Sequence, residues 1–282
     1  MTIDEVIDLA LIEDLGDGDH TSLATIPYEA IGKAVLTAKE SGVLAGIGVA
    51  AQVFKKLDPN VVIDFQKEDG SIIQAGDVVF TVEGKSQSLL SAERTALNFI
   101  QRMSGIATFT HQIVQKLDGL QTKVLDTRKT TACNRTIEKL AVKIGGGFNH
   151  RFGLFDMIMI KDNHVDFAGG IQQAIHATKT YLSEKGKDLK IEIEVRNFAE
   201  LEEVLQTGGV DRIMLDNFIP NDLMLAVQLI NNRYETEASG GISIDTIREY
   251  AETGVDFISV GALTHQIKSL DLSLTAVQQS SN

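Results

Sequence analysis

The sequence predicts an α/β protein with two domains, the second of them an incomplete α/β barrel of six to seven strands. From residue 123 onward, short apolar runs that end in polar residues alternate with helical segments: KVLDT, MIMIK, KIEIEV, RIMLD, YETEAS and FISVG. Repeated strand–helix units predict parallel strands with right-handed crossovers, and six of them suit a closed or nearly closed barrel better than a short open sheet. The first hundred residues mix helices and strands without this alternation. They therefore predict a separate α/β sandwich-like domain.

The N-terminal domain is expected to span residues 1–107 and to begin with a helix over residues 2–15. Thr2 and Glu5 have capping-box spacing, and apolar residues recur at helical intervals after them. The runs KAVLTAKE, VVIDFQ and DVVFTVEG read as strands with glycines at the turns, and a helix is expected to end near Leu57. A long helical region begins near Leu89.

The barrel is expected over residues 108–264, and residues 265–282 are expected to pack back on the N-terminal domain. In α/β barrels the chemistry lies at the carboxyl ends of the strands. Each strand-like run here delivers polar residues at that end: Arg128 and Lys129, Lys161, Glu194, Asp216, Ser239 and Ser259. The sequence therefore predicts a functional site on this rim.

Composition limits the classes of protein that remain. The chain has 282 residues, 43% of them hydrophobic and 23% charged, which is ordinary for a globular protein. The single cysteine, Cys133, excludes an intramolecular disulfide and fits a reducing compartment. No secretory signal or membrane-spanning run is visible, so we expect a cytoplasmic protein without a membrane partner. A pI near 4.9 argues against nucleic-acid binding.

Positive charge is nevertheless concentrated between residues 127 and 151. This segment contains only one acidic residue, Glu138. Its basic residues are Arg128, Lys129, Arg135, Lys139, Lys143 and Arg151. A local excess of cations on a chain of net charge −13 predicts an anion site. Arginine suits carboxylates through paired hydrogen bonds and lysine supplies a point charge, so a small dicarboxylate fits. A surface salt-bridge network is the alternative, but it would need acids that this segment lacks.

Two further groups complete the predicted rim. Glu194 and Asp216 end successive strands and could hold Mg²⁺, although acids in such places are often helix caps or lysine partners. The glycine turns SGG (239–241) and VGAL (260–263) each follow a strand and precede a helix, where backbone N–H groups can bind phosphate. No Ser–His–Asp or Cys–His arrangement appears in the sequence.

Several of these segments resemble the signatures of the quinolinate phosphoribosyltransferase family. The resemblance lies in DTRKTT (126–131), GGGFNHR (145–151) and MIKDNH (159–164), with further similar segments at 92–108, 191–195, 214–218, 238–242 and 259–265. It therefore covers nearly the whole chain. It implies phosphoribosyl transfer from phosphoribosyl pyrophosphate to quinolinate with decarboxylation, giving nicotinate mononucleotide, pyrophosphate and CO₂ in NAD biosynthesis.

The resemblance also implies roles for individual residues. It implies catalytic roles for Lys129, Lys161, Glu194 and Asp216, the last two as ligands of a Mg²⁺ cofactor. It implies substrate binding by Arg94, Arg128, His150, Arg151, Lys161, Ser239, Gly240, Gly241, Gly261 and His265. From the residues alone, Arg94 would be a solvated helix residue. The resemblance instead implies a homodimer, within a possibly higher oligomer, in which Arg94 is donated across the interface.

The sequence departs from the family pattern in two places. Ala132-Cys133-Asn134 stands where the family often has Pro-Gly, which makes Arg135 a weaker candidate ligand than Arg128. Arg196 follows IEIEV where the family more often carries an acid. It could pair with Glu194 and weaken a metal site, although adjacent strand residues should face opposite ways.

Three other hypotheses fit parts of this pattern. Lys161 could form a Schiff base, as in a barrel aldolase. A related phosphoribosyltransferase, including the molybdenum-linked paralogues, could use another acid. A catalytically silent metabolite-binding barrel is the third. The joint presence of cations, acids and glycine turns argues against the first and third.

Overall fold

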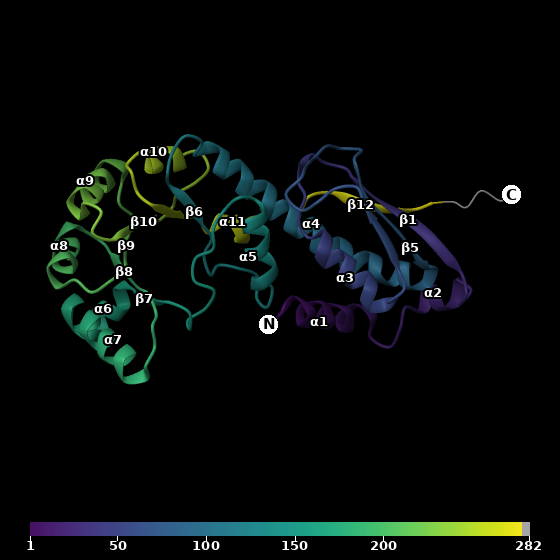
Figure 1. Ribbon diagram of the computed structural model, residues 1–282, viewed down its shortest axis with the longest axis horizontal. Helices are drawn as coiled ribbons and strands as arrows, with labels where there is room; N and C mark the ends of the chain where they lie inside the picture. The colour runs from purple at the N-terminus through teal and green to yellow at the C-terminus, as the bar shows by residue number, and fades with distance from the viewer. Residues whose placement is uncertain (278–282) are drawn as a thin grey trace. The chain divides into compact units, whose positions relative to one another are not determined.

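The computed structural model describes residues 1–277, which form two compact units (Figure 1). The first unit comprises residues 1–111, 130–146 and, of the described C-terminal residues, 263–277, and the second comprises 112–129 and 147–262. Both are mixed α/β, so the predicted fold class is confirmed. Residues 130–146, inside the range expected for the barrel domain, cluster with the first unit. Of the expected C-terminal tail, 278–282 lie outside the described residues.

The first unit is built on a four-stranded antiparallel sheet. Its order is β12-β1-β5-β3, with β1 at Ile31–Ala38, β3 at Val62–Phe65, β5 at Val78–Lys85 and β12 at Leu272–Ala276. Ala34, Leu36 and Ala38 alternate to the buried face of β1, as the period of a strand requires. A second, two-stranded ladder joins β2 (Gly42–Val43) to β4 (Ile72–Ile73).

Helices complete this unit. They are α1 (Ile3–Leu15), α2 (His20–Thr25), α3 (Ile47–Leu57), α4 (Ser86–Lys116), α5 (Arg135–Ile144) and α11 (Ala262–His265), of which α4 and α11 cross into the second unit. The predicted capping box of α1 forms: Glu5 N–H donates to Thr2 Oγ1 at 3.2 Å, and Thr2 N–H to Glu5 Oε2 at 2.7 Å. Phe54 of α3 packs edge-on against Phe80 of β5 in the core.

A buried ion pair explains why residues 130–146 belong to the first unit. Glu138, fully buried, accepts hydrogen bonds from the guanidinium of Arg102 on α4, the shorter at 2.9 Å. Thr131 also donates to Glu138, through its N–H at 3.0 Å and its hydroxyl at 2.8 Å. At Gly145 an added Cβ would lie 2.5 Å from the carbonyl oxygen of Ala107, so only glycine allows this close approach.

The second unit is an open parallel sheet. Its order is β6-β11-β10-β9-β8-β7, with β6 at Lys123–Leu125, β7 at Ile158–Ile160, β8 at Ile191–Val195, β9 at Arg212–Asp216, β10 at Glu235–Ser239 and β11 at Phe257–Ser259. Every predicted run contains one of these strands. A parallel bridge between Leu125 and Phe148 places one further segment beside β6, where a seventh strand would lie. No pairing closes the sheet against β7 among the described residues, so the incomplete barrel of six to seven strands is confirmed.

Helices form the layer outside this curved sheet (Figure 1). They are α6 (Asp162–Ala168), α7 (Ile171–Lys185), α8 (Phe198–Thr207), α9 (Pro220–Ile230) and α10 (Ile247–Ala251). Strand β8 is buried at every position, and Glu192 and Glu194 alternate there with Ile191, Ile193 and Val195. The strand therefore turns its acids to one face and its aliphatic side chains to the other. No helix within residues 1–277 is both long and apolar enough to cross a membrane.

Candidate active site

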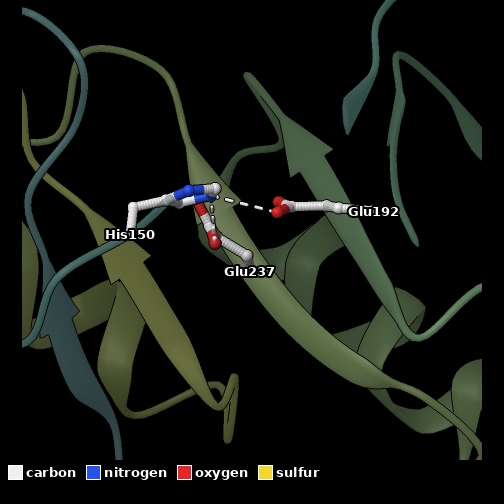
Figure 2. A group of neighbouring side chains, drawn as sticks. All are labelled: His150, Glu192 and Glu237. Carbon is white, nitrogen blue, oxygen red and sulfur yellow. Dashed lines mark ion pairs between the residues drawn. The ribbon is translucent and has the colours of Figure 1, made fainter. Parts of the chain in front are cut away.

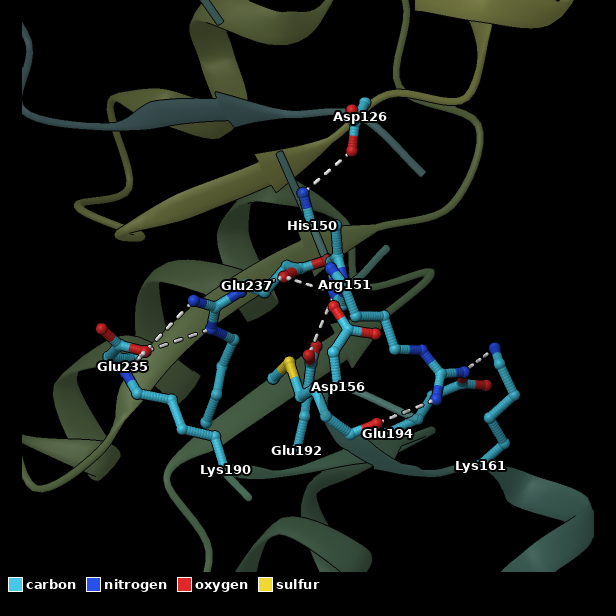
Figure 3. Close-up of polar contacts among 12 residues, drawn as sticks. Asp126, His150, Arg151, Asp156, Lys161, Lys190, Glu192, Glu194, Glu235 and Glu237 are labelled. Carbon is cyan, nitrogen blue, oxygen red and sulfur yellow. Dashed lines mark hydrogen bonds and ion pairs between the residues drawn. The ribbon is translucent and has the colours of Figure 1, made fainter. Parts of the chain in front are cut away.

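Three of the predicted rim residues meet at the carboxyl ends of β7, β8 and β9. Lys161 follows β7 directly, and its Nζ lies 2.8 Å from Oε2 of Glu194 (Figure 3). Glu194 also interacts electrostatically with Asp216, the last residue of β9. Burial and the nearby Glu194 raise the pKa of Asp216, while Lys161 and hydrogen bonds from Ser239 and Asn217 act in the opposite direction.

This pair of acids fits Mg²⁺. Two carboxylates that repel each other gain stability from a cation between them, and Mg²⁺ is usually held by one or two carboxylates together with substrate phosphates. The possible competitor Arg196 does not reach Glu194. Its guanidinium pairs with Asp166 at 3.2 Å and with Glu200 at 2.6 Å. Arg196 lies beyond the end of β8, so the alternation of the strand does not set the direction of its side chain.

Two arginines supply positive charge at the same end of the barrel. Arg128 lies just beyond β6, and Arg151 follows the bridged residue Phe148. Partial burial lowers the pKa of Arg151, and the charge of Arg128 lowers it further, against the attraction of Glu192 and Asp156. The two guanidinium groups are therefore close enough to repel each other, which an anionic ligand would relieve. Lys129, next to Arg128, is exposed, and its N–H donates to Thr127 Oγ1 at 3.0 Å.

His150 lies deeper than its neighbours, with 7% of its surface exposed. Its Nε2 faces two fully buried glutamates, Glu192 at 3.0 Å and Glu237 at 3.4 Å (Figure 2). Its Nδ1 accepts the backbone N–H of Arg151 at 2.6 Å. Substrate binding by His150 stays a prediction, because these contacts turn its ring nitrogens toward the protein.

The charge state of His150 is set by opposing effects. Burial lowers the pKa, whereas the contacts with Glu192 and Glu237 raise it, to about 9 overall. Burial and the charge of Glu237 also raise the pKa of Glu192. The Arg151 N–H donates to Nδ1, and Nε2 is the ring nitrogen that faces the two carboxylates.

Sequence reasoning missed Glu192, Glu237 and Arg212. Arg212 on β9 donates from Nη1 to Glu237 at 2.9 Å and from Nη2 to Glu235 at 3.1 Å, and its guanidinium carbon lies 4.1 Å from the ring centroid of Phe257. Burial raises the pKa of Glu237, but the His150 hydrogen bond and the charges of His150 and Arg212 lower it overall. A usable signal was present, because glutamates at alternate positions of the buried runs IEIEV and ETEAS must point to one face.

The glycine turn after β10 is shaped by close packing. Gly240 has a φ of 104°, and an added Cβ would lie 2.3 Å from Oδ1 of Asn217, itself at a φ of 57° after β9. A helix follows SGG as predicted, although not directly. Helix α10 begins only at Ile247, because the hydroxyls of Ser243 and Thr246 hold an intervening turn. Gly261 immediately precedes α11, which has four residues.

Three predicted residues belong to the first unit. Arg94 is exposed on α4 and makes no hydrogen bond or ion pair among the described residues. His265 is exposed at the end of α11. The Nε of Arg135 donates to Thr130 Oγ1 at 3.1 Å, which ties it to its own loop. The other predicted site residues lie in the second unit.

Comparison with known families agrees with this geometry. The profile for the N-terminal domain of quinolinate phosphoribosyl transferase matches residues 19–104, and the profile for its C-terminal domain matches residues 106–275. The chain belongs to the quinolinate phosphoribosyltransferase family.

Individual relatives are similar over nearly their full length. The chain is 44% identical to quinolinate phosphoribosyltransferase [decarboxylating] 1b of Nicotiana tabacum, over 95% of this chain and 81% of that one. It is 43% identical to the probable nicotinate-nucleotide pyrophosphorylase [carboxylating] of Bacillus subtilis, over 93% and 89%. The crystal structure of NadC from Streptococcus pyogenes superposes with a TM-score of 0.92 at 42% identity, over 98% of this chain and 97% of that one.

These family members favour the predicted assignment over a molybdenum-linked paralogue or a silent metabolite-binding barrel. The structure also weighs against an aldolase. A Schiff-base lysine needs a neutral amine, whereas Lys161 is paired with the carboxylate of Glu194.

Proposed function

We propose that the protein transfers the phosphoribosyl group of phosphoribosyl pyrophosphate to quinolinate and releases CO₂ and pyrophosphate, forming nicotinate mononucleotide for NAD biosynthesis. This proposal rests on one observation: a pair of arginines and a pair of acidic residues lie at the same end of the barrel, at the carboxyl ends of its strands. The mutually repelling Arg128 and Arg151 call for an anion. The mutually repelling Glu194 and Asp216 call for a cation.

Quinolinate fits the cationic part of the rim. It carries two carboxylates on a small ring, and the predicted ligands Arg128, Arg151 and Lys161 together offer more positive charge than a single carboxylate needs. Guanidinium groups bind carboxylates through paired hydrogen bonds, and lysine adds a point charge. Arg151 is already oriented by the donation of its Nη1 to the carbonyl of Met157 at 3.2 Å.

Phosphoribosyl pyrophosphate fits the acidic part together with Mg²⁺. Glu194 and Asp216 would hold the ion, which would neutralise charge on the departing pyrophosphate. The turn at Ser239, Gly240 and Gly241 and the residue Gly261 are proposed to bind phosphate through backbone N–H groups. His265 is proposed to assist them. The absence of a helix start directly at Gly241 means that this binding depends on the turn itself rather than on a helix dipole.

The reaction requires the protein mainly to position the two reactants and to stabilise the charges that develop on them. The ring nitrogen attacks C1 of the ribose as the C1–oxygen bond to pyrophosphate breaks, through a state with positive charge on the ribose. The alkylated ring then accepts the electron pair of the bond to the 2-carboxylate, CO₂ leaves, and C2 takes up a proton. We assign Lys129 and Lys161 to holding the negative groups in place during these steps.

The proposed assembly is a homodimer, alone or as part of a higher oligomer. Arg94 would act on the substrate bound by the partner subunit, and its exposure without a partner among residues 1–277 supports this assignment. A cytoplasmic location is also part of the proposal, because the free and exposed Cys133 suits a reducing compartment.

One assay tests the proposed function most directly. Purified protein with phosphoribosyl pyrophosphate and Mg²⁺ is given quinolinate or nicotinate, and the release of pyrophosphate and CO₂ is measured. We expect both products with quinolinate and no turnover with nicotinate. Comparable turnover of nicotinate would overturn the proposed substrate. Binding of both substrates without release of pyrophosphate would favour a silent binding protein.

A further inference from the structure

The segment that carries His150 and Arg151 crosses the opening of the barrel. Upstream, Phe148 is tied to β6 and the residue after it, since its N–H donates to the carbonyl of Val124 at 2.8 Å and its own carbonyl accepts the N–H of Asp126 at 3.0 Å. The described strand pairings then resume only at β7, which pairs with β8. The rim arginine Arg151 therefore stands where the sheet itself supplies no continuous ladder.

Interior side chains hold this segment. The backbone N–H of His150 donates to Oδ1 of the fully buried Asp126 at 2.8 Å. The ring reaches across the barrel to Glu192 of β8 and Glu237 of β10. The N–H of Arg151 in turn donates to the same ring at Nδ1. Displacement of the ring would therefore remove a hydrogen bond of the Arg151 backbone.

Glu237 is itself held by residues of the neighbouring strands. Arg212 of β9, between β8 and β10, donates to Glu237 at 2.9 Å, and the hydroxyl of Ser259 on β11 also hydrogen-bonds to Glu237 (Figure 3 shows the glutamates and His150). Glu192 lies two residues before Glu194 on the same face of β8, about 6–7 Å deeper in the barrel. It is fully buried. Neither glutamate is therefore placed to touch a substrate at the rim.

We propose that Glu192 and Glu237 are positioning residues: they hold His150 inside the barrel and thereby fix Arg151 in place for the carboxylate of the substrate. This inference rests on the proposed function and adds two residues that do not contact the ligand. Glu192 also attracts the charge of Arg151 directly, so its loss removes two constraints on the same arginine.

A metal ion is the competing explanation of this cluster. His150, Glu192 and Glu237 each offer one ligand atom, and these atoms lie within 4.8 Å of one another. The cluster is already supplied with positive partners, however, because Arg212 pairs with Glu237 and the Nε2 proton of His150 faces both glutamates. A divalent ion would have to displace that proton and compete with Arg212. The ion-pair network accounts for the geometry without it.

The test compares three substitutions of the same kind. Glu192→Gln and Glu237→Gln remove a charge that faces His150, whereas Glu235→Gln removes a charge from the outer end of the network, where Glu235 pairs with Arg212 and Lys190 but not with His150. Calorimetry measures the Kd of each variant for quinolinate and for phosphoribosyl pyrophosphate with Mg²⁺. Steady-state kinetics measures kcat and both KM values, and thermal melting measures folding.

We expect the Kd and KM for quinolinate to rise about tenfold in Glu192→Gln and Glu237→Gln. The Kd for phosphoribosyl pyrophosphate should stay within about twofold, as should both affinities of Glu235→Gln. A second readout is coupling: in a His150→Ala background, Glu237→Gln should no longer change quinolinate affinity, because the residue through which it acts is gone. Wild-type protein that fails to bind quinolinate would instead overturn the proposed function.

Three results would overturn the positioning role while leaving the proposed function intact. One is unchanged quinolinate affinity in folded variants. Another is an equal loss of affinity for both substrates. The third is failure of both Glu192→Gln and Glu237→Gln to fold, which would show that the network serves the stability of the barrel alone.

Discussion

The ammonium of Lys161 lies 2.8 Å from the carboxylate of Glu194 and joins the end of β7 to the end of β8. Each partner of this ion pair is also a proposed ligand of a different reactant, since Lys161 would bind quinolinate and Glu194 would bind Mg²⁺ with phosphoribosyl pyrophosphate. The pair is half-exposed on the lysine side and nearly buried on the glutamate side. The two reactants are therefore expected to meet at this contact.

Removal of Mg²⁺ with a chelator should abolish turnover. Glu194→Ala or Asp216→Ala should raise the Mg²⁺ concentration needed for half-maximal activity, because each removes one of two carboxylates available to the ion. Mg²⁺ titrations of activity measure this. The control is Glu252→Ala, which removes an exposed acid paired with Arg248 and should leave the titration unchanged. Unaltered titrations in both site variants would exclude Glu194 and Asp216 as the metal site.

Lys161→Ala and Arg151→Ala should weaken quinolinate binding far more than phosphoribosyl pyrophosphate binding. Loss of a charge-assisted contact costs about 1.5–3 kcal/mol, or roughly 10- to 150-fold in Kd. Calorimetry with each ligand measures the two effects separately. Lys190→Ala is the matched control, because this exposed lysine pairs with Glu235 near the amino ends of the strands. Equal losses for both ligands would mean that the cations and the acids have been assigned to the wrong reactants.

Arg94 can be tested by complementation between subunits. Arg94→Ala and Lys161→Ala homodimers should each be inactive. If Arg94 acts on its partner's site, a heterodimer of the two has one doubly damaged site and one intact site, and random mixing should restore about a quarter of wild-type activity. Activity assays of mixed and separate variants measure this. Without recovery, and with subunit exchange verified by mass spectrometry, the shared site would be excluded.

His150 should make the stability of the barrel depend on pH. Against the effect of burial, its contacts with Glu192 and Glu237 raise its pKa from 6.5 to about 9, so the proton that this cluster takes up in the folded protein stabilises it fully below pH 6.5, and this contribution is lost as the pH rises through about 9. The shift corresponds to about 3 kcal/mol at most. Urea unfolding of wild type and His150→Gln at several pH values should show their difference shrinking over this window. His20→Gln, at an exposed histidine 3.4 Å from Asp17, is the control and should follow wild type. A difference independent of pH would contradict the assignment.

Cys133→Gly should stabilise the protein. Cys133 has a φ of 60°, a left-handed conformation that costs a non-glycine residue about 1–2 kcal/mol. Glycine removes this strain but also raises the conformational entropy of the unfolded chain, which offsets part of the effect. The free energy of unfolding should therefore rise by about 0.5–1 kcal/mol, as measured by urea unfolding. Ala132→Gly, one residue earlier and outside the left-handed region, should destabilise by a similar amount. Lower stability of Cys133→Gly would show that the loop does not hold this strain.

Local patterns in the sequence determined the kinds of element and the ends at which the polar residues stand. The capping box of α1, the six barrel strands and the rim positions of Lys161, Glu194 and Asp216 all follow from spacing within short segments. A strand repeats every two residues, and its last residue is visible where the apolar run stops. That is why the rim could be predicted without knowledge of which strands pair.

Tertiary structure alone decided which side chains meet. Glu138 looked like a lone acid among local cations, yet it pairs with Arg102 of α4. His150 looked like a rim ligand, yet it is buried against Glu192 and Glu237, which are distant in the chain. The first contact depends on the packing of α5 against α4, and the second depends on the order of the strands in the sheet. Neither is encoded in the period of any single segment.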